Sequence, residues 1–415
     1  MGKMKKILGK WWIPDLSKKK LSGVLYIEKD GHSSLETIGL FDENNFQIIR
    51  YKTIWGLTSD NDEVSLFDCV LTSSKRTSAP FSQGTYTPSV VAIGKHISSW
   101  DEKGNYDVQA AIEELKYWIR IKTISPQKDG ETWHISWKFI PIDSLKIDEN
   151  TVLEIGGGSR IHYSDYGMKL YVDQQVSVFF NHVEQISLQD AKRELVNFEQ
   201  FMSFATLKHV THTNFWLFDK NKGSSSPIEI FEPKEIEENE HRFFTYLFDY
   251  ETIKDEFASM IKTWYNDSKL TTIRNYLIDS ICAQGYYTSI RFLLVANASN
   301  GYYIRYVDKT IREQEYLKKM AEDFKGIEKI DPLEEGDRKL IGNTRHHYSH
   351  LLLEDARQIA DDAKIRKYTF ILRKYVICCV LRVLGLDDIK INEILNKSQN
   401  YYIQKIEDTN ILSRK

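Results

Sequence analysis

Cysteine is scarce in this chain of 415 residues, which has only Cys69, Cys282, Cys378 and Cys379. None of them forms a C-x-x-C pair, so a zinc site built from cysteine thiolates is not expected. Cys378 and Cys379 are adjacent, and adjacent side chains on a helix point in different directions. These two cysteines are predicted to be buried free thiols in a reducing compartment.

Long apolar runs are also missing. The most apolar stretch, residues 368–386, is interrupted by Arg373, Lys374 and Arg382, whereas a membrane-spanning helix needs about 20 nearly uninterrupted apolar residues. The basic start, residues 1–6, has no apolar stretch behind it and is a poor signal peptide. We therefore expect a cytoplasmic protein that does not associate with a membrane.

The chain lacks a strong excess of either charge. Its formal net charge of −3 gives no nucleic-acid signature for the chain as a whole. The part from residue 241 onward is mildly basic and the part before it is acidic, which is compatible with phosphate binding in the C-terminal part. The aromatic content of 13% argues against wholesale disorder, and the length allows two or three domains.

The residues before the region 220–240 are predicted to form mostly strands. Apolar and β-branched stretches alternate there with clusters of Asp, Asn and Glu. Asp30-Gly31 predicts a hairpin-type turn after residues 24–29. Gly156-Gly157-Gly158 lacks the Lys-Ser/Thr ending of a phosphate-binding loop and predicts a wide turn. Further candidate strands lie at 35–41, 46–57, 64–71, 89–96, 134–142, 151–155, 168–172 and 176–182.

Two helices are expected within this β-rich part, around residues 111–118 and 188–205, from apolar residues at steps of three and four. Ser187 followed by Asp190 predicts the N-terminal cap of the second helix. Gly, Ser, Pro and a run of acids over residues 220–240 predict a domain boundary.

Beyond that boundary the apolar period becomes helical. Long helices are expected at 241–266, 271–295, 302–327 and 363–384, with Gly385 ending the last, and an acidic loop at 331–343. The sequence thus predicts a two-domain α+β protein. A β-rich N-terminal domain with sandwich or barrel-like sheets covers residues 1–235, and an all-α domain covers 236–415.

The most compact set of reactive side chains is Arg345-His346-His347-Tyr348-Ser349-His350. We expect this segment to open a helix capped by Asn343 or Thr344. His346 and His350 would then share one face, at i and i+4, with Arg345 one position away. The free N–H groups of the first turn would add a partial positive charge. The sequence therefore predicts a cationic corner that binds a phosphodiester.

Such a corner suits RNA, whose 2′-hydroxyl lies beside the scissile phosphorus. His350 is the candidate base or acid because imidazole titrates near neutral pH, and Arg345 would stabilise the pentacoordinate phosphorane. His346 would position the phosphate or transfer the second proton. This chemistry needs no metal or cofactor, and an isologous dimer would bring two such sets together.

The helical part resembles a HEPN domain, a family whose members carry an R-x(4–6)-H motif and are often metal-independent endoribonucleases that work as dimers. The matching residues are Arg345, His346 and His350. Residues 341–345 and Leu384-Gly385-Leu386 are similar to the HEPN domains of ApeA-type anti-phage proteins. Four segments near the N-terminus resemble the start of the ApeA N-terminal domain. They are Gly9-Lys10-Trp11-Trp12-Ile13-Pro14-Asp15, Ser22-Gly23-Val24-Leu25, Trp55-Gly56-Leu57 and Val64-Ser65-Leu66-Phe67-Asp68-Cys69.

The resemblance implies an abortive-infection effector. Its N-terminal domain would bind a phage-derived trigger, and its HEPN domain, as a homodimer, would cut host RNA, with tRNA as a candidate. The residue after the arginine is often Asn in this family and is His346 here, which keeps a hydrogen-bonding side chain. An acidic residue is common after the Phe-Leu pair, whereas here Phe292-Leu293 leads into Ala298-Ser299-Asn300.

Other interpretations stay open. The chain would be a non-catalytic binding protein if its helical domain only bound a nucleotide or formed a dimer while the β-rich part recognised a phage component. The aromatic excess also fits a carbohydrate-binding β-domain. A zinc site at His346 and His350 would lack the H-E-x-x-H glutamate and a third ligand. Trp11 and Trp12 form either a stacking platform or core, since neighbours on a strand face opposite sides.

Overall fold

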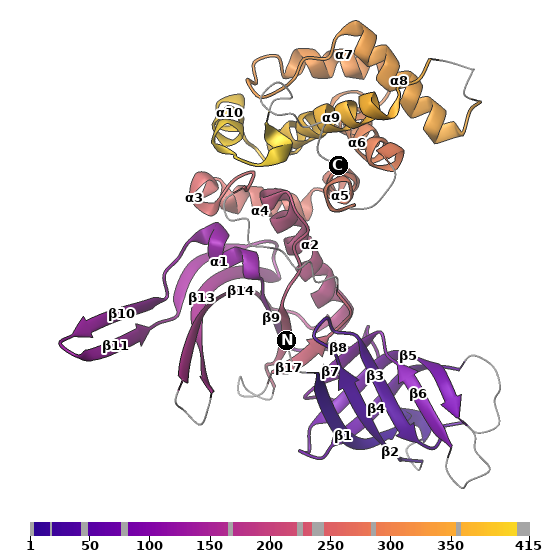
Figure 1. The fold of residues 1–415 in the computed structure, drawn as a ribbon, viewed down its shortest axis with the longest axis vertical. Helices are drawn as coiled ribbons and strands as arrows, with labels where there is room; N and C mark the ends of the chain where they lie inside the picture. Colours follow the sequence, from indigo (N-terminus) through magenta and orange to yellow (C-terminus); the bar gives the residue numbers. More distant parts are fainter. Residues whose placement is uncertain are drawn as a thin grey trace. The chain divides into compact units, whose positions relative to one another are not determined.

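The computed structural model describes residues 4–16, 19–42, 49–75, 82–164, 169–221, 227–234, 245–283, 288–353 and 358–404. The chain divides into two compact units. The first comprises Met1–Lys116, Ile121–Val196 and Thr211–Glu240, and the second comprises Tyr117–Arg120, Asn197–Val210 and His241–Lys415. The expected order of a β-rich part followed by a helical part is confirmed (Figure 1).

The first unit begins with a closed six-stranded antiparallel barrel. Around it the strands follow the order β1-β2-β3-β6-β5-β4, and β4 pairs with β1 to close the ring. The bounds are β1 Lys5–Trp12, β2 Leu21–Ile27, β3 Ser33–Ile38, β4 Arg50–Thr58, β5 Glu63–Lys75 and β6 Gln83–Thr87. The turn at Asp30-Gly31 is confirmed, because Gly31 has a φ of 82° and donates its N–H to Glu28 at 3.1 Å.

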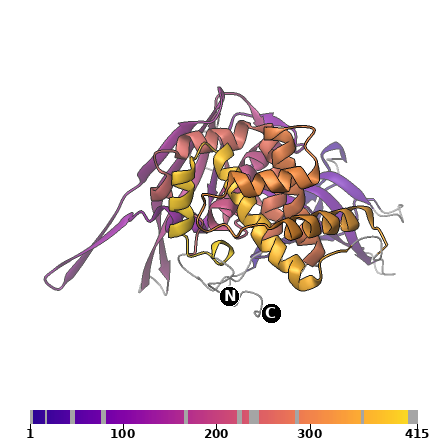
Figure 2. The same cartoon turned by 90° about the horizontal axis from the view of Figure 1, so that it is seen from above.

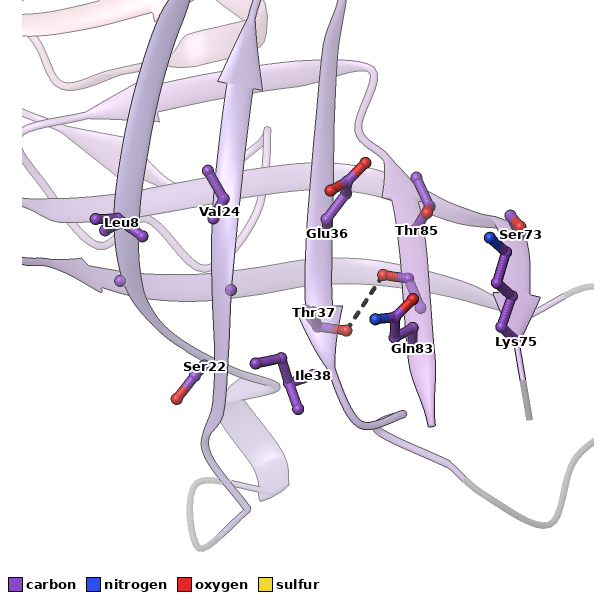
Figure 3. Close-up of a pocket in the computed structure, with 13 residues that line it drawn as sticks. Leu8, Ser22, Val24, Glu36, Thr37, Ile38, Ser73, Lys75, Gln83 and Thr85 are labelled. Carbon is purple, nitrogen blue, oxygen red and sulfur yellow. Dashed lines mark hydrogen bonds between the residues drawn. The ribbon is translucent and has the colours of Figure 1, made fainter. Parts of the chain in front are cut away.

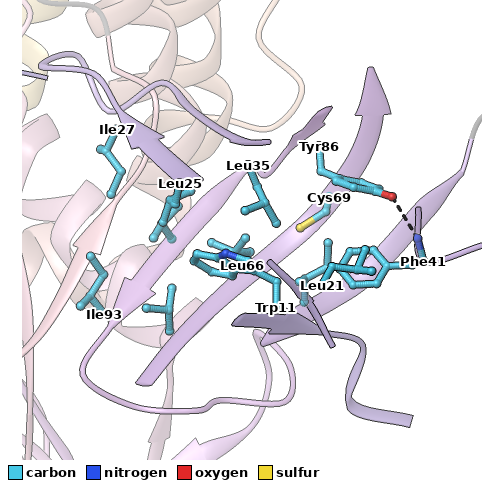
Figure 4. Packing of buried hydrophobic residues seen from close by; sticks show 13 residues of the cluster. Trp11, Leu21, Leu25, Ile27, Leu35, Phe41, Leu66, Cys69, Tyr86 and Ile93 are labelled. Carbon is cyan, nitrogen blue, oxygen red and sulfur yellow. Dashed lines mark hydrogen bonds between the residues drawn. The ribbon is translucent and has the colours of Figure 1, made fainter. Parts of the chain in front are cut away.

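Alternation of inward and outward side chains along these strands builds the barrel core. Trp11 lies in the middle of a cluster of buried apolar residues from several strands (Figure 4). Gly56 makes room for it, since a Cβ there would lie 2.3 Å from the Trp11 ring. Trp12 is also buried and meets His96 edge to face, so neither tryptophan is a freely exposed stacking platform. The cluster includes Leu21, Leu25, Ile27, Leu35, Phe41, Leu66, Cys69, Tyr86 and Ile93.

The sheet continues beyond the barrel because β5 also pairs with β7. From there the order is β7-β17-β16-β9-β14-β13-β12, with all these neighbours antiparallel. A separate ribbon is formed by β10 and β11, and a short pair by β8 and β15. The bounds are β7 Val90–Ile93, β8 Lys103–Gly104, β9 Tyr106–Ala111, β10 Ile124–Asp129, β11 Thr132–Trp137, β12 Ile140–Lys146, β13 Thr151–Ser164, β14 Lys169–His182, β15 Ile186–Ser187, β16 Asn214–Asp219 and β17 Ile228–Phe231.

The wide turn expected at Gly156-Gly157-Gly158 is wrong. All three glycines lie inside β13, paired with Ser177, Val176 and Gln175 of β14. A Cβ on Gly156 would lie 2.1 Å from the ring of Phe139, so the missing side chain leaves space for that ring. Glycine marks a close approach here rather than a change of chain direction.

The two helices predicted in the N-terminal part are present as α1 Glu113–Ile119 and α2 Leu188–Thr206. The predicted cap of α2 is confirmed, because the N–H of Asp190 donates to Ser187 Oγ at 3.1 Å and the Ser187 hydroxyl donates to Asp190 at 2.8 Å. Residues 197–210, including the second half of α2, belong to the helical unit. There Asn197 accepts a hydrogen bond from Arg274 at 2.7 Å.

The helical unit contains shorter helices than the sequence predicts. Of the helix expected at 241–266, the described part is not helical at 245–249 and breaks between α3 and α4. The expected helix at 271–295 is divided between α5 and α6. The one expected at 302–327 consists of a π-helical turn, Tyr303–Val307, and α7. The helices are α3 Tyr250–Ile253, α4 Phe257–Asn266, α5 Ser268–Cys282, α6 Thr288–Tyr302, α7 Glu313–Asp323, α8 Glu335–His350, α9 Asp362–Val383 and α10 Asp388–Lys397. Short 3-10 turns lie at Pro14–Leu16 and Tyr401–Ile403.

Helix α9 is the buried rod that the sequence predicts, and α5, α6 and α10 pack against it. Figure 2 shows the helical unit from above. Asp361 caps its start by accepting the N–H of Lys364 at 2.8 Å. Gly385, with a φ of 95°, ends the helix as predicted. Its N–H donates to the carbonyl of Arg382, and the N–H of Leu386 donates to the carbonyl of Leu381. Among the described residues, no helix has the length and apolarity that crossing a membrane requires.

Cys378 and Cys379 are buried free thiols, as the sequence predicts. Cys69 is also a buried free thiol, whereas the free thiol of Cys282, at the end of α5, is half-buried. Burial raises the pKa of Cys378 to about 12, so this thiol stays protonated near neutral pH.

Candidate functional site

The arginine–histidine segment lies at the end of a helix, not at its start. Helix α8 runs from Glu335 to His350, so the expected loop at 331–343 is mostly helix and neither Asn343 nor Thr344 is an N-cap. Glu335 and Asp337, which the sequence predicts within this loop, lie in the first turn of α8. There their carboxylates complement the positive end of the helix dipole. The prediction that first-turn N–H groups contribute to phosphate binding is therefore wrong, and the segment lies beside the carbonyl end.

Asn343 and Thr344 have structural roles instead. The hydroxyl of Thr344, which is fully buried, donates to Leu340 at 2.7 Å and accepts the N–H of Ala360 at 2.9 Å. The Asn343 amide donates to the carbonyl of Gln358 at 3.1 Å. These bonds attach the chain just before α9 to the last turns of α8, and so fix the turn that carries the reactive residues.

The start of α8 is also attached to neighbouring elements. The Tyr368 hydroxyl, on α9, donates to Asp337 at 2.7 Å, and Arg338 donates to the carbonyl of Leu333 at 2.5 Å. Burial, followed by the hydrogen bond to Asp337, raises the pKa of Tyr368. Both ends of α8 are therefore held, which suits a helix that must present side chains in fixed positions.

The helix ends immediately after the segment, at Leu351. This residue has a φ of 52° and a ψ of 45°, in the left-handed region, where the helix cannot continue. Its side chain is 87% exposed. His350, also exposed, is thus the last helical residue and lies at the surface of the unit.

Arg345 is held by a residue of a different helix. Its guanidinium donates to the side-chain oxygen of Asn297 on α6 at 3.2 Å, and α6 packs against α8. Arg345 is half-buried, which keeps part of the guanidinium accessible. The Asn297 amide orients the guanidinium and carries no charge itself, so this hydrogen bond does not neutralise the arginine.

The two predicted histidines share one face of α8. The rings of His346 and His350 are 4.6 Å apart between centroids, at an interplanar angle of 53°, as the i and i+4 spacing predicts. His346 is half-buried and His350 exposed. His347 lies off this face and contacts Tyr348 edge to face, with centroids 5.0 Å apart. The structure thus brings His346 and His350 together, with Arg345 on the same turn.

Asn297 is the residue that the sequence reasoning missed. The family resemblance implies an acidic residue after Phe292-Leu293, where this chain has Ala298-Ser299-Asn300. Ser299 is buried and donates to the carbonyl of Val295 at 2.8 Å, so it serves the helix itself. A signal for Asn297 was its position as a polar residue within the apolar run of α6, but no spacing connects it to Arg345 along the chain.

A metal centre has no support among the residues that the structure describes, where no group of three or more His, Cys, Asp or Glu is placed to hold an ion. His212, of the H-x-x-H pair with His209, is buried, and its ring lies 3.9 Å from the Glu232 carboxylate. What the α8 site offers is one oriented guanidinium and two adjacent imidazoles, a set that can bind a phosphate and move protons.

Comparison with known proteins identifies one family. The model of ApeA N-terminal domain 1 matches residues 6–264, which include the barrel, the remainder of the large sheet, α1 to α3 and most of α4. Arg345, His346 and His350 lie outside the matched range. No curated protein and no solved structure matches the chain.

Proposed function

Because the chain belongs to the family defined by ApeA N-terminal domain 1, we propose that it is an anti-phage defence protein whose helical part is a metal-independent HEPN endoribonuclease. The observation that carries the proposal is the set on α8, where Arg345 is oriented by Asn297 and His346 lies beside His350. The N-terminal part would recognise a phage-derived trigger. Cellular RNA is the substrate class, and tRNA is the first substrate to test.

The proposed reaction is attack of the RNA 2′-hydroxyl on the adjacent phosphorus. His350 accepts the hydroxyl proton, the new bond joins O2′ to phosphorus, and the bond from phosphorus to O5′ breaks. Arg345 stabilises the negative charge on the phosphorane oxygens, and His346 gives a proton to the leaving O5′. The products are a 2′,3′-cyclic phosphate and a 5′-hydroxyl. DNA, which has no 2′-hydroxyl, would not be cut.

A homodimer through the helical part belongs to the same proposal. In one chain the two imidazoles lie on one face of one helix, whereas in-line displacement needs the base and the acid on opposite sides of the phosphorus. An isologous interface near the end of α8 would bring a second set of the same residues to the phosphate. His350 of one chain would then act as the base, and the partner's His346 would act as the acid on the opposite side of the phosphorus.

The test is cleavage of total RNA and purified tRNA by the full-length protein in the presence of EDTA. Arg345→Ala and His350→Ala should each abolish cleavage and the toxicity of the protein in cells while leaving its thermal unfolding unchanged. His347→Ala is the matched control, since His347 lies on the same turn but off the shared face, and it should retain activity. Full cleavage by both alanine variants would refute the catalytic assignment.

The carbonyl end of α8 supports a second candidate function. Since first-turn N–H groups do not assist phosphate binding at this segment, the helical part would serve as a non-catalytic dimerisation module. In that case the purified protein cuts no RNA either before or after incubation with lysate from phage-infected cells. Cyclic phosphate ends on the products would exclude this candidate.

A further inference from the structure

The outer surface of the barrel carries a groove of about 590 Å³ that crosses strands β1, β2, β3, β6 and β5 (Figure 3). We propose that this groove binds an extended peptide segment of a partner protein, one that carries an apolar residue together with an acidic and a basic group. The groove lies within the first unit and is remote in sequence from the residues of α8. Calling the partner an infection trigger rests on the proposed function, whereas peptide binding itself does not.

The floor of the groove is backbone, as the register of the strands shows. Gly9 pairs with Gly23, Gly23 pairs with Thr37, and Thr37 pairs with Gly84. Side chains at this row point into the barrel, and Thr37 donates there to the carbonyl of Gly84 at 3.3 Å. A Cβ on Gly23 would lie 2.4 Å from the Glu36 carbonyl oxygen, and one on Gly9 would lie 2.7 Å from that of Leu57. The glycines are therefore required by the barrel and leave a floor without side chains.

The walls are the outward-facing rows on either side of that floor. One row carries Leu8, Val24 and Glu36, and the other carries Ile38 and Lys75. Leu8 is 61% exposed and Ile38 is 55% exposed, so two large apolar side chains flank the end of the groove at β1, β2 and β3. Hydroxyl and amide groups line the rest, from Ser22, Ser73, Gln83 and Thr85.

The described residues that line the groove include one carboxylate, Glu36, and one ammonium, Lys75. Glu36 and Lys75 are both exposed, and neither is in an ion pair with another of the described residues. A single-stranded nucleic acid is bound by several cations and by aromatic rings on which its bases stack. Among the residues that the structure describes, this lining has one cation, one opposing carboxylate and no aromatic residue. It complements a ligand of mixed charge with an apolar group, which describes a peptide and not a polyanion.

The dimensions agree with that assignment. Five neighbouring strands about 4.8 Å apart span roughly 19 Å, and an extended peptide rises about 3.3 Å per residue, so the groove accommodates five or six residues. The barrel is closed, so the peptide is held by side-chain pockets and polar groups and not by addition to a sheet edge. Its apolar residue would lie between Leu8 and Ile38, and its acidic residue would pair with Lys75.

The experiment selects binders from a displayed random hexapeptide library on the full-length protein carrying His350→Ala, which avoids toxicity. The enriched peptides are then synthesised with a fluorophore, and their dissociation constants are measured by anisotropy. We expect sequences with one apolar, one acidic and one basic residue, and at least tenfold weaker binding to the same protein with Ile38→Asp or Lys75→Glu. Leu57→Asp and Lys29→Glu are the matched controls, since both residues are exposed and outside the groove. Proteins with these substitutions should bind the peptides with unchanged dissociation constants.

Absence of enrichment, or equal binding of the enriched peptides to the Ile38→Asp protein, would overturn the proposal. Binding of oligouridylate RNA is measured in parallel. If the protein binds this RNA but no peptide, and Lys75→Glu abolishes the RNA binding, the peptide proposal is overturned in favour of nucleic acid. None of these measurements uses RNA cleavage. A groove that binds peptide in a protein without nuclease activity would thus separate this proposal from the enzymatic one.

Discussion

Replacing Asn297 by aspartate should inactivate the protein without weakening its fold. The side-chain oxygen of Asn297 lies 3.2 Å from the Arg345 guanidinium, on a helix that packs against α8. Asn297→Asp keeps the size and shape of the side chain and changes an orienting amide into a carboxylate. The carboxylate would compete with the phosphodiester for the same cation.

The size of the effect follows from the distance. Two unit charges 3.2 Å apart interact by roughly 5 kcal/mol at an effective dielectric constant of about 20, and by about 1 kcal/mol in bulk water. Arg345 is half-buried, so an intermediate value of about 3 kcal/mol applies. If the RNA phosphate must displace the carboxylate introduced by Asn297→Asp from Arg345, cleavage should be roughly 100-fold slower, because about 1.4 kcal/mol corresponds to a factor of ten in rate. Solvent screening limits the gain in folding stability to about 1 kcal/mol or less.

The assay combines RNA cleavage with thermal unfolding for three variants. Asn297→Asp should lose roughly 100-fold in cleavage and unfold at the same or a slightly higher temperature. Asn297→Ala, which removes only the orienting hydrogen bond, should lose about tenfold. Asn300→Asp places the same charge on the same helix at a half-buried position three residues later and should cleave normally. If Asn297→Asp cleaves as fast as the unaltered protein, Arg345 does not act through the guanidinium seen beside Asn297.

Two further predictions concern the buried groups of the helical unit. Burial raises the pKa of the Cys378 thiol to about 12. A disulfide reagent at pH 8 should therefore modify Cys282 rapidly and the three buried cysteines only after unfolding, as measured by mass spectrometry of the labelled protein. Rapid labelling of Cys378 in the folded protein would contradict the packing of α9. Lys374, fully buried on α9, pairs with Asp331, so Lys374→Met alone should cost about 3–5 kcal/mol in urea unfolding because it leaves the carboxylate without its partner. The double variant with Asp331→Leu should recover most of that loss, and equal losses in the single and double variants would show that the ion pair is not the source.

Local patterns in the sequence were sufficient wherever the structure depends on neighbouring residues. The cap of α2 needs only Ser187 and Asp190, and the end of α9 needs only a glycine at position 385. The closing of the barrel depends on β1 pairing with β4, which no local signal specifies. Glycine was the most misleading residue, because at Gly156 it marks the approach of a ring and at Gly342 it lies buried within α8.

The same distinction explains the reactive segment. The spacing of His346 and His350 is a property of any helix, and the structure has their rings in contact. The end of the helix at which they lie could not be predicted, because acidic residues such as Glu335 and Asp337 are common both in loops and in the first turn of a helix. The partner of Arg345 comes from a helix some fifty residues earlier and depends on tertiary packing alone.

The position of the segment at the carbonyl end of α8 changes how a phosphate would have to be bound. At a helix start, backbone N–H groups supply part of the positive charge. At Leu351 the backbone presents carbonyl oxygens instead, so the positive charge within one chain must come from side chains, chiefly Arg345. A phosphorane carries two negative charges, and one half-buried guanidinium neutralises only one of them. If the segment binds a phosphodiester, the geometry therefore makes a second cationic set more necessary than the sequence alone implied, and an isologous partner would be the simplest way to supply it, because it would bring another Arg345 to the same phosphate.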